Sequence, residues 1–351
     1  MINSLYIKNF KSIDEYKFEL GSLNLFVGPN SSGKSSAIQA LLLVCDNARK
    51  DSVAHKMVCK HMQMPSFKEL RNFVTNAKAY YVAVNDVEMT FTPADDSLTG
   101  TIVSQLKGFE PLDLNKLTRN VLYLPAARTS ELSETRINQD PDSNVFGLFG
   151  EYIIDYFQNH KDDLIPDSVI KDRSSLTFSG QLNYWLKKLT GYTIHVQLDG
   201  AEYKVRYVGL GGKEIHPHHV GTGVSFITGV LIAGLASCID GGLLIVENPE
   251  IHLHPAAQAD IIDFLAMIAD AGSQVMVETH SDHLFNGARR LLRSKVMKEQ
   301  AVRVFNFRHA DNGTSVVKRI MLNQQGGIYN DEPGLFDQFD RDLAAILGDL
   351  A

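Results

Sequence analysis

A glycine-rich loop carries the clearest chemistry in this sequence. Residues 28–35 read Gly-Pro-Asn-Ser-Ser-Gly-Lys-Ser, the complete pattern G-x-x-x-x-G-K-S. The glycines let the backbone wrap around a phosphate with its N–H groups turned inward. Lys34 is expected to reach the β and γ phosphates, and the Ser35 hydroxyl to ligate Mg²⁺. The residues predicted to contact the nucleotide are Asn30, Ser31, Ser32, Gly33, Lys34, Ser35 and Ser36.

The segments on either side of the loop fit this function. Residues 23–27 are an apolar run that predicts a buried strand, and residues 36–44 predict a helix without a breaker. Strand, glycine-rich turn and helix form the context in which such a loop binds phosphate. The alternative is a glycine turn that only introduces a core helix.

A second apolar strand, residues 243–246, ends at Glu247. Ligands bind at the carboxyl ends of parallel strands, and Mg²⁺ prefers carboxylate oxygens. We therefore predict that Glu247 and Ser35 hold Mg²⁺. The alternative is a strand that merely ends in a charged residue.

A third strand, residues 275–277, leads into Glu-Thr-His-Ser at residues 278–281. A histidine at this position, His280, can hydrogen-bond the γ phosphate or the attacking water. It could also be a helix cap or a core residue. His252 and His254 suggest a metal, but they lack a third nearby ligand, and His216, His218 and His219 are assigned to a loop.

A second glycine turn lies at residues 221–225, Gly-Thr-Gly-Val-Ser, before an apolar helix. A glycine turn with a hydroxyl at a helix N-terminus can bind an anion. Because one subunit already has a phosphate loop, the simplest use of this turn is to bind the phosphate of a second subunit. A plain helix cap is the alternative.

The remaining pattern predicts an α/β protein. Short alternating strands fill residues 4–27 and 80–91, a helical pattern covers residues 144–189, and a hairpin follows around Asp199-Gly200. From residue 224 onward strands alternate with helices, which predicts a parallel sheet with crossover helices. Two further strands and a short helical pattern near the C-terminus complete the chain.

The composition is that of an ordinary globular protein. The chain has 351 residues and a net charge of −7, so it lacks the basic excess of a general nucleic-acid binder. A local basic cluster at residues 289–298 is either a DNA contact or a solvated face. The three cysteines have no metal spacing, which favours a cytoplasmic location. The apolar run at residues 224–246 is broken by glycines and predicts a buried helix and strand, with no membrane span.

Taken together, these motifs resemble the ABC-type ATPase heads of the SMC and OLD group. The string at residues 248–255, Asn-Pro-Glu-Ile-His-Leu-His-Pro, resembles the OLD-like branch most closely. Residues 326–328 and 331–337 resemble a small C-terminal domain found in bacterial ATPases of anti-phage operons, relatives of the Toprim-less PtuA-like proteins.

The resemblance implies ATP and Mg²⁺ as ligands and a head-to-tail dimer with ATP between the subunits. Gly223 and Ser225 would contact the partner's γ phosphate, and Lys11 and Ser12 would lie near the base and ribose. His280 would be the switch histidine. The glutamine that usually reaches Mg²⁺ has only a weak candidate, Gln63.

Two departures from the family pattern matter. Asn248 stands where a catalytic glutamate is usual, and an amide cannot take a proton from water; Glu250 could replace the base if its side chain turns inward. The segment from about residue 128 to 216 is too short for an SMC arm, and no nuclease cluster is recognisable. We therefore expect a slow ATPase whose output comes from a partner.

The sequence thus predicts an ABC-ATPase head with an N-terminal antiparallel β subdomain, a P-loop parallel-sheet core and a helical insert. The predicted divisions are 1–127, 128–216, 217–322 and 323–351. The predicted partners are a second copy and an effector such as a nuclease or toxin, in anti-phage defence. The alternatives are a non-hydrolysing scaffold and a DNA-end-sensing head.

Overall fold

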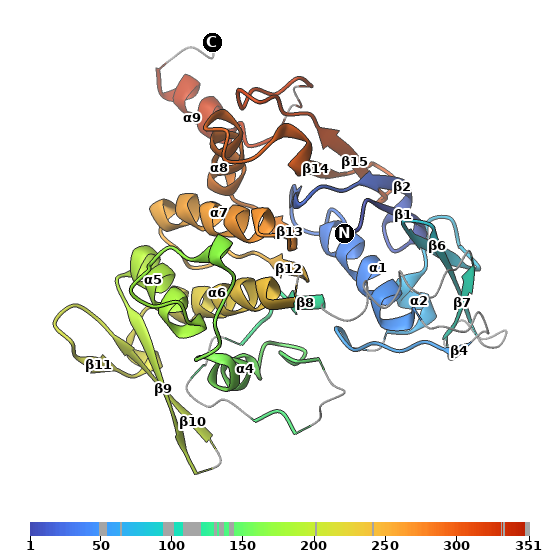
Figure 1. Cartoon of the computed structure of the whole chain (residues 1–351). Helices are drawn as coiled ribbons and strands as arrows, with labels where there is room; N and C mark the ends of the chain where they lie inside the picture. Colours follow the sequence, from blue (N-terminus) through green and yellow to red (C-terminus); the bar gives the residue numbers. More distant parts are fainter. Residues whose placement is uncertain are drawn as a thin grey trace.

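A mixed sheet of six strands forms the centre of the molecule (Figure 1). The computed structural model describes residues 1–48, 55–63, 65–93, 102–107, 121–129, 132, 137–139, 144–200, 202–240, 242–330, 332 and 334–347. The strand order is β15-β14-β3-β13-β12-β8, and all neighbours are parallel except β14 and β15. These strands are β3 (Leu23–Val27), β8 (Val121–Leu124), β12 (Leu243–Glu247), β13 (Gln274–Thr279), β14 (Val302–His309) and β15 (Ser315–Ile320).

Both faces of the central sheet are covered, which explains the continuous apolar runs of its inner strands. Alternate residues of one strand point to opposite faces: Leu25 packs in one core cluster and Phe26 in the other. Helix α1 (Lys34–Asn47) covers the second face together with an antiparallel sheet. The first face carries α5 (Phe178–Thr190), α6 (Thr222–Asp240), α7 (Pro255–Asp270) and α8 (Asp282–Arg293).

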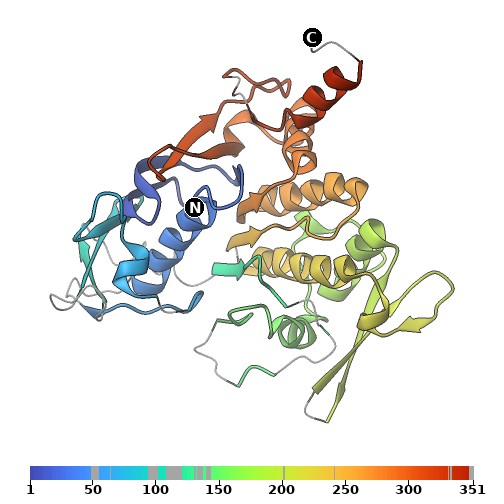
Figure 2. The ribbon, with the colours of Figure 1, turned by 180° about the vertical axis from the view of Figure 1, so that it is seen from behind.

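The antiparallel sheet forms the other side of the molecule, at the right of Figure 1 and the left of Figure 2. Its order is β2-β1-β5-β6-β7-β4, and the predicted turn at Asn85 has a positive φ of 53°. Its elements are β1 (Ser4–Phe10), β2 (Ile13–Glu19), β4 (His55–Lys56), β5 (Tyr80–Val84), β6 (Val87–Pro93) and β7 (Ile102–Lys107), with the short helix α2 (Phe67–Leu70) nearby.

The insert between β8 and α6 packs on the helical side and sends out a hairpin (Figure 2). Short helical turns and loops interrupt the helical pattern expected at residues 144–189, so that only part of it is helix. The elements here are α4 (Ile153–His160), β9 (Thr193–Asp199), β10 (Glu202–Val208), β11 (Glu214–Ile215) and the 3-10 turns Asp167–Val169 and Pro217–His219. A third turn, Glu299–Ala301, precedes β14.

Helix α6 is the apolar segment that the sequence assigns to the core. Among the described residues it is the helix long and apolar enough to cross a bilayer, but 83% of the window Thr222–Ile239 is buried inside the fold. Its apolar residues pack against α5, α7 and β12, as expected for a core helix.

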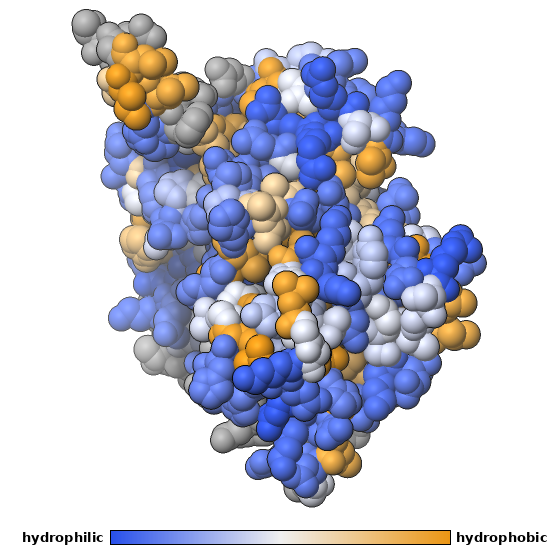
Figure 3. Space-filling model, turned by 90° about the vertical axis from the view of Figure 1, so that its left-hand side faces the viewer, coloured by the Kyte–Doolittle hydropathy of each residue, from blue (hydrophilic) through white to orange (hydrophobic). Residues whose placement is uncertain are grey.

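Part of the C-terminal tail docks onto the head. Glu332 forms ion pairs with Arg308 of β14 and Lys318 of β15. The Phe336 ring lies 5.4 Å from that of Phe285 on α8, and Leu335 is buried in the core. Helix α9 (Gln338–Leu347) then leaves the body, and an apolar cluster protrudes at the upper left of Figure 3, above a largely hydrophilic face.

Candidate active site

The glycine-rich loop joins β3 to α1 and adopts a backbone that requires its glycines. Gly28 has φ of 136° and Gly33 has φ of 104°, and Ser31 between them is also left-handed at 61°. A Cβ on Gly28 would lie 2.2 Å from the Phe307 carbonyl oxygen. The loop is therefore fixed by the sheet beneath it, and the N-terminus of α1 is aimed into it, as a phosphate site requires.

Lys34 folds back over the loop. Its Nζ donates to the carbonyl oxygens of Gly28 at 3.0 Å and Pro29 at 2.8 Å. It also lies 3.7 Å from Glu278 Oε1. Burial lowers the pKa of Lys34, and the nearby Glu278 charge opposes that shift.

A neighbouring strand braces the outside of the loop. Ser315 Oγ, on β15, lies 2.7 Å from both Ser12 Oγ and the Ser32 carbonyl oxygen. His309 Nε2 lies 3.1 Å from the Asn30 carbonyl oxygen. Ser12 therefore reaches the loop through Ser315, and Ser315 and His309 are contacts that no local motif revealed. Ser36 lies in the first turn of α1.

Lys11 lines a hollow of about 290 Å³ together with Gln39 of α1 and Tyr123 of β8, and no residue of the phosphate loop lines it. Lys11 Nζ donates to Gln39 Oε1 at 2.5 Å, and burial lowers the Lys11 pKa. Gln63 lines the same hollow. Lys11 and Gln63 therefore lie near each other, next to β8.

Two carboxylates stand side by side at the strand ends, because Glu247 of β12 is in register with Glu278 of β13. Glu247 Oε1 accepts from the Tyr123 hydroxyl at 2.9 Å, and its Oε2 accepts from the Ala126 N–H at 3.0 Å. Glu278 Oε2 accepts from the Ser35 hydroxyl at 2.8 Å. Of these two, Glu278 is the carboxylate that lies against the phosphate loop.

The side chain of Glu250 turns inward. The sequence indicates Glu250 as a replacement base in that case. Its Oε1 accepts from the Thr279 hydroxyl at 2.6 Å and from the His280 N–H at 3.0 Å. Its Oε2 is buried without a hydrogen-bond partner, as is Asn248 Oδ1. Asn248 itself has a left-handed φ of 46°. Glu250 Oε2 and Asn248 Oδ1 therefore remain as unused acceptors. His280, in contrast, is exposed.

Burial is the main electrostatic influence on these groups. It raises the pKa values of Glu247 and Glu250. Burial, reinforced by the charge of Glu247, raises the pKa of Glu278 from 4.5 to about 7. Burial and the Lys34 charge lower the pKa of His280. Buried carboxylates with raised pKa values at a strand end are typical of functional sites.

Arg128 is a residue that sequence reasoning missed. Its guanidinium donates to the carbonyl oxygens of Glu247 at 2.7 Å and Asn248 at 2.9 Å, and it lies 5.1 Å from the centre of the Phe226 ring on α6. Burial lowers its pKa to about 10. Arg128 therefore ties the end of β12 to the start of α6. Its carbonyl partners are 119 and 120 residues away, so no sequence motif could reveal it.

The glycine turn predicted at residues 221–225 is mostly helix, because α6 already begins at Thr222. A Cβ on Gly223 would lie 2.4 Å from the His252 carbonyl oxygen, so this glycine lets the two loops pack together. Gly221 and Thr222 are exposed, but Ser225 is only 3% exposed and lies 3.5 Å from the Tyr207 hydroxyl. Gly221 and Thr222 are therefore accessible, whereas Gly223 is buried and the Ser225 hydroxyl faces inward.

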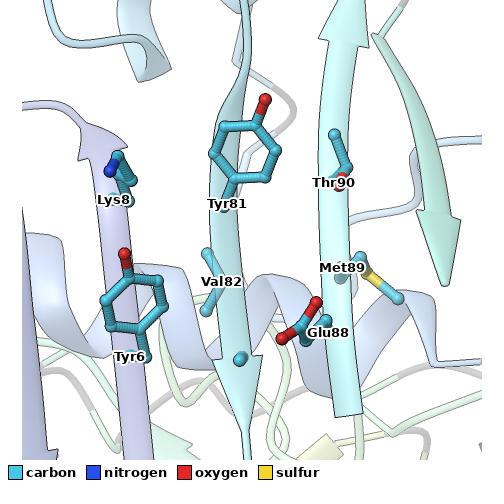
Figure 4. Close-up of a pocket in the computed structure, with 8 residues that line it drawn as sticks. Tyr6, Lys8, Tyr81, Val82, Glu88, Met89 and Thr90 are labelled. Carbon is cyan, nitrogen blue, oxygen red and sulfur yellow. The ribbon is translucent and has the colours of Figure 1, made fainter. Parts of the chain in front are cut away.

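The histidine clusters do not form a metal site among the described residues, since no group of three possible ligands gathers there. His216 and His218 stack on each other, and His254 caps α7. The larger hollow, about 380 Å³, lies on the outer face of the antiparallel sheet (Figure 4). Tyr6, Lys8 and Tyr81 line it, and it includes no residue of the phosphate loop.

The residues at the loop fit a magnesium ion. Ser35 offers a hydroxyl, and Glu278 offers a carboxylate next to it. Oxygen donors of this kind are those that Mg²⁺ prefers, usually together with substrate phosphates.

Comparison with known structures shows the fold of an SMC head. An SMC head bound to the C-winged helix domain of ScpA matches with a TM-score of 0.62 at 17% identity, over 92% of this chain and 98% of that one. A Pyrococcus furiosus SMC head bound to the C-terminal domain of ScpA matches with a TM-score of 0.58 at 14% identity, over 99% of both chains. A Thermotoga maritima SMC head has a TM-score of 0.50 at 13% identity, over 91% and 98%. The parallel core and antiparallel region predicted from the sequence are thereby confirmed.

A curated relative and a family model extend the comparison. The uncharacterized protein MJECL10 of Methanocaldococcus jannaschii is 48% identical over 44 residues, or 12% of this chain, and the match spans only 20% of that relative. Residues 23–286 match the family described as "AAA domain, putative AbiEii toxin, Type IV TA system". This match includes both the phosphate loop and the ends of β12 and β13. The chain belongs to this AAA family, and its fold is that of an ABC-type P-loop ATPase head.

Proposed function

We propose that this chain is a Mg²⁺-dependent ATPase whose copies close head to tail on ATP, and that this closure controls a partner protein. The observation that carries the proposal is the phosphate loop itself, with Lys34 and Ser35 turned toward the buried carboxylates of β12 and β13. This arrangement places a cation and a hydroxyl for the phosphates next to a group of buried acids.

The side chains divide the work as follows. Lys34 and the loop N–H groups bind the phosphates, and Ser35 with the strand-end carboxylates would hold Mg²⁺. When bound, Mg²⁺ would offset charge on the phosphate oxygens. Glu250 accepts the proton of the attacking water at its unpaired Oε2, while Thr279 and the His280 N–H hold its other oxygen in place. His280 orients the water or the γ phosphate.

The N-terminal end of α6 supplies the contact with a second copy. The exposed Gly221 and Thr222 present main-chain N–H groups at a helix N-terminus, where an anion binds. Gly223 is buried, so it would reach an anion only through its backbone. Ser225 contributes its hydroxyl only if it turns away from Tyr207, so closure of the dimer would include a local rearrangement of α6.

The partner is proposed to be an effector such as a nuclease or toxin in bacterial anti-phage defence, and the location the cytoplasm. The family description names a toxin of a type IV toxin–antitoxin system, and two similar SMC heads were solved with a domain of ScpA bound. The motifs at residues 248–255 and 326–337 support an OLD-like, PtuA-like subgroup.

One alternative has an observation in its favour. Asn248 has no acid to offer at the usual position of the base, so the protein could be a nucleotide-bound scaffold that does not hydrolyse ATP. The DNA-sensing alternative is weaker in this structure. Arg289 donates to the Gly326 carbonyl oxygen and Arg290 pairs with Asp263, so both serve the fold.

The test is to measure phosphate release and mass by light scattering for the full chain with Mg²⁺-ATP, in wild type, Lys34→Ala and the exposed control Lys213→Ala. We expect slow release and a doubled mass for wild type and the control. Lys34→Ala should lose both, with release reduced about 100-fold or more. Assembly without release would favour the scaffold, and absence of both from wild type would contradict the proposal.

A further inference from the structure

We infer that Glu278, rather than Glu247 alone, is the carboxylate that works with Ser35 to hold the magnesium ion of bound ATP. The inference rests on the proposed nucleotide function and deepens it. It assigns a ligand role to the acid at the end of β13, one strand nearer to the phosphate loop than the expected acid on β12.

The order of the strands places Glu278 closer to the loop than Glu247. Strand β13 lies directly between β3, which leads into the loop, and β12, which carries Glu247. Glu278 is in register with Phe26 on one side and with Glu247 on the other. Because neighbouring strands are about 4.8 Å apart, Glu247 starts one full strand farther from the loop.

The contacts of Glu278 are the second argument. Its Oε2 accepts from Ser35 Oγ at 2.8 Å, and its Oε1 lies 3.7 Å from Lys34 Nζ. It therefore contacts the hydroxyl that the loop motif assigns to Mg²⁺ and the ammonium that it assigns to the phosphates. A hard cation bound by Ser35 would meet Glu278 before any other carboxylate described in this part of the chain.

The contacts of Glu247 point the same way. Its two oxygens accept from the Tyr123 hydroxyl and the Ala126 N–H. These bonds hold Glu247 toward β8, away from the loop. Glu247 could then interact with Glu278 or with a water molecule bound to the metal. Its substitution should therefore weaken Mg²⁺ binding less than substitution of Glu278.

Glu278 could instead be a latch that holds Lys34 and Ser35 and must leave before nucleotide enters. The two roles predict opposite effects of Glu278→Gln. A metal ligand, once removed, weakens the coupling between Mg²⁺ and nucleotide. A latch, once removed, tightens nucleotide binding and leaves the Mg²⁺ requirement unchanged.

The experiment measures binding of a fluorescent, non-hydrolysable ATP analogue to the full chain as Mg²⁺ is titrated, with an EDTA reference. The variants are wild type, Glu278→Gln, Glu247→Gln and the exposed hairpin control Glu202→Gln. Mn²⁺ replaces Mg²⁺ in a parallel titration followed by electron paramagnetic resonance, which reports metal binding directly. Thermal melting checks that each variant is folded.

We expect the Mg²⁺ midpoint of Glu278→Gln to rise about 10- to 100-fold, with a smaller rise for Glu247→Gln and none for Glu202→Gln. Binding in EDTA should be no weaker in Glu278→Gln than in wild type. Combining Ser35→Ala with Glu278→Gln should add little, since both remove the same site. If Glu278→Gln does not fold, Glu278→Asp should shift the midpoint in the same direction.

An unchanged Mg²⁺ midpoint in Glu278→Gln, or a larger shift in Glu247→Gln, would overturn the inference while the proposed function stands. Tighter nucleotide binding with an unchanged Mg²⁺ requirement would assign the latch role and overturn it too. If wild type binds no nucleotide with or without Mg²⁺, the proposed function itself fails.

Discussion

The acids at the strand ends and the acid of the C-terminal tail have pKa values that are shifted in opposite directions. Glu332 in the tail is neutralised by Arg308 and Lys318, and Lys318 holds its pKa below the ordinary range. Glu247, Glu250 and Glu278 are buried together and have raised pKa values. The charges of Lys34 and Arg128 offset this burial only in part, and Lys34 Nζ lies 3.7 Å from Glu278 Oε1.

This difference separates a structural acid from a functional one. The ion pairs of the buried Glu332 with two half-exposed cations fasten the tail with charges that the chain itself supplies. Burial of acids without matching cations costs stability, and such groups persist where a ligand supplies the missing charge. The loop of α1 beside them is the natural place for that ligand.

We expect the largest effect on stability at Arg128. This buried cation lies near the acids, and its guanidinium donates hydrogen bonds to backbone carbonyl oxygens. Arg128→Met should lower the free energy of unfolding by about 2–3 kcal/mol, since buried carbonyls of Glu247 and Asn248 lose their donors. Urea denaturation against the exposed control Arg173→Met measures it. Equal stability of the two variants would mean that these contacts do not fix the end of β12.

Glu332→Gln tests the tail side of the comparison, with a smaller effect. Lys318 and Arg308 lower the pKa of Glu332 below 4.5, so the folded state holds this acid ionised longer than the unfolded state does. The stability from Glu332 is present above pH 4.5 and is lost as pH falls through the folded pKa.

Because its cationic partners are about half exposed, Glu332→Gln should cost about 1 kcal/mol or less at neutral pH. The difference from wild type should vanish in acid. Urea denaturation measures this difference in wild type, Glu332→Gln and the exposed control Glu299→Gln. The measurements run from about pH 3 to about pH 7. A difference that grows in acid would contradict the ion-pair account.

Much of this architecture follows from the sequence because its signals are local. The loop at residues 28–35 lies between a strand and a helix, and the acids follow apolar strands. The hairpin at Asn85 and the buried helix α6 are confirmed for the same reason. The hydrogen bonds and turns that define them involve residues close in the chain.

The remaining features depend on contacts between distant segments. Which acid lies against Ser35 is decided by the order of β3, β13 and β12, which no single motif specifies. The inward turn of Glu250 depends on Thr279, 29 residues away. The buried position of Ser225 depends on Tyr207 of the hairpin, and the docking of the tail depends on β14 and β15.

We propose that the buried acids at the strand ends serve ATP chemistry, with Glu250 in place of the base that Asn248 cannot supply. The most direct measurement is single-turnover phosphate release from Mg²⁺-ATP by wild type and Glu250→Gln, with nucleotide affinity measured on the same samples. Glutamine keeps an oxygen for Thr279 and the His280 N–H, so the fold should hold. We predict release reduced about 100- to 10,000-fold with unchanged affinity. Release at the wild-type rate from Glu250→Gln would contradict the account.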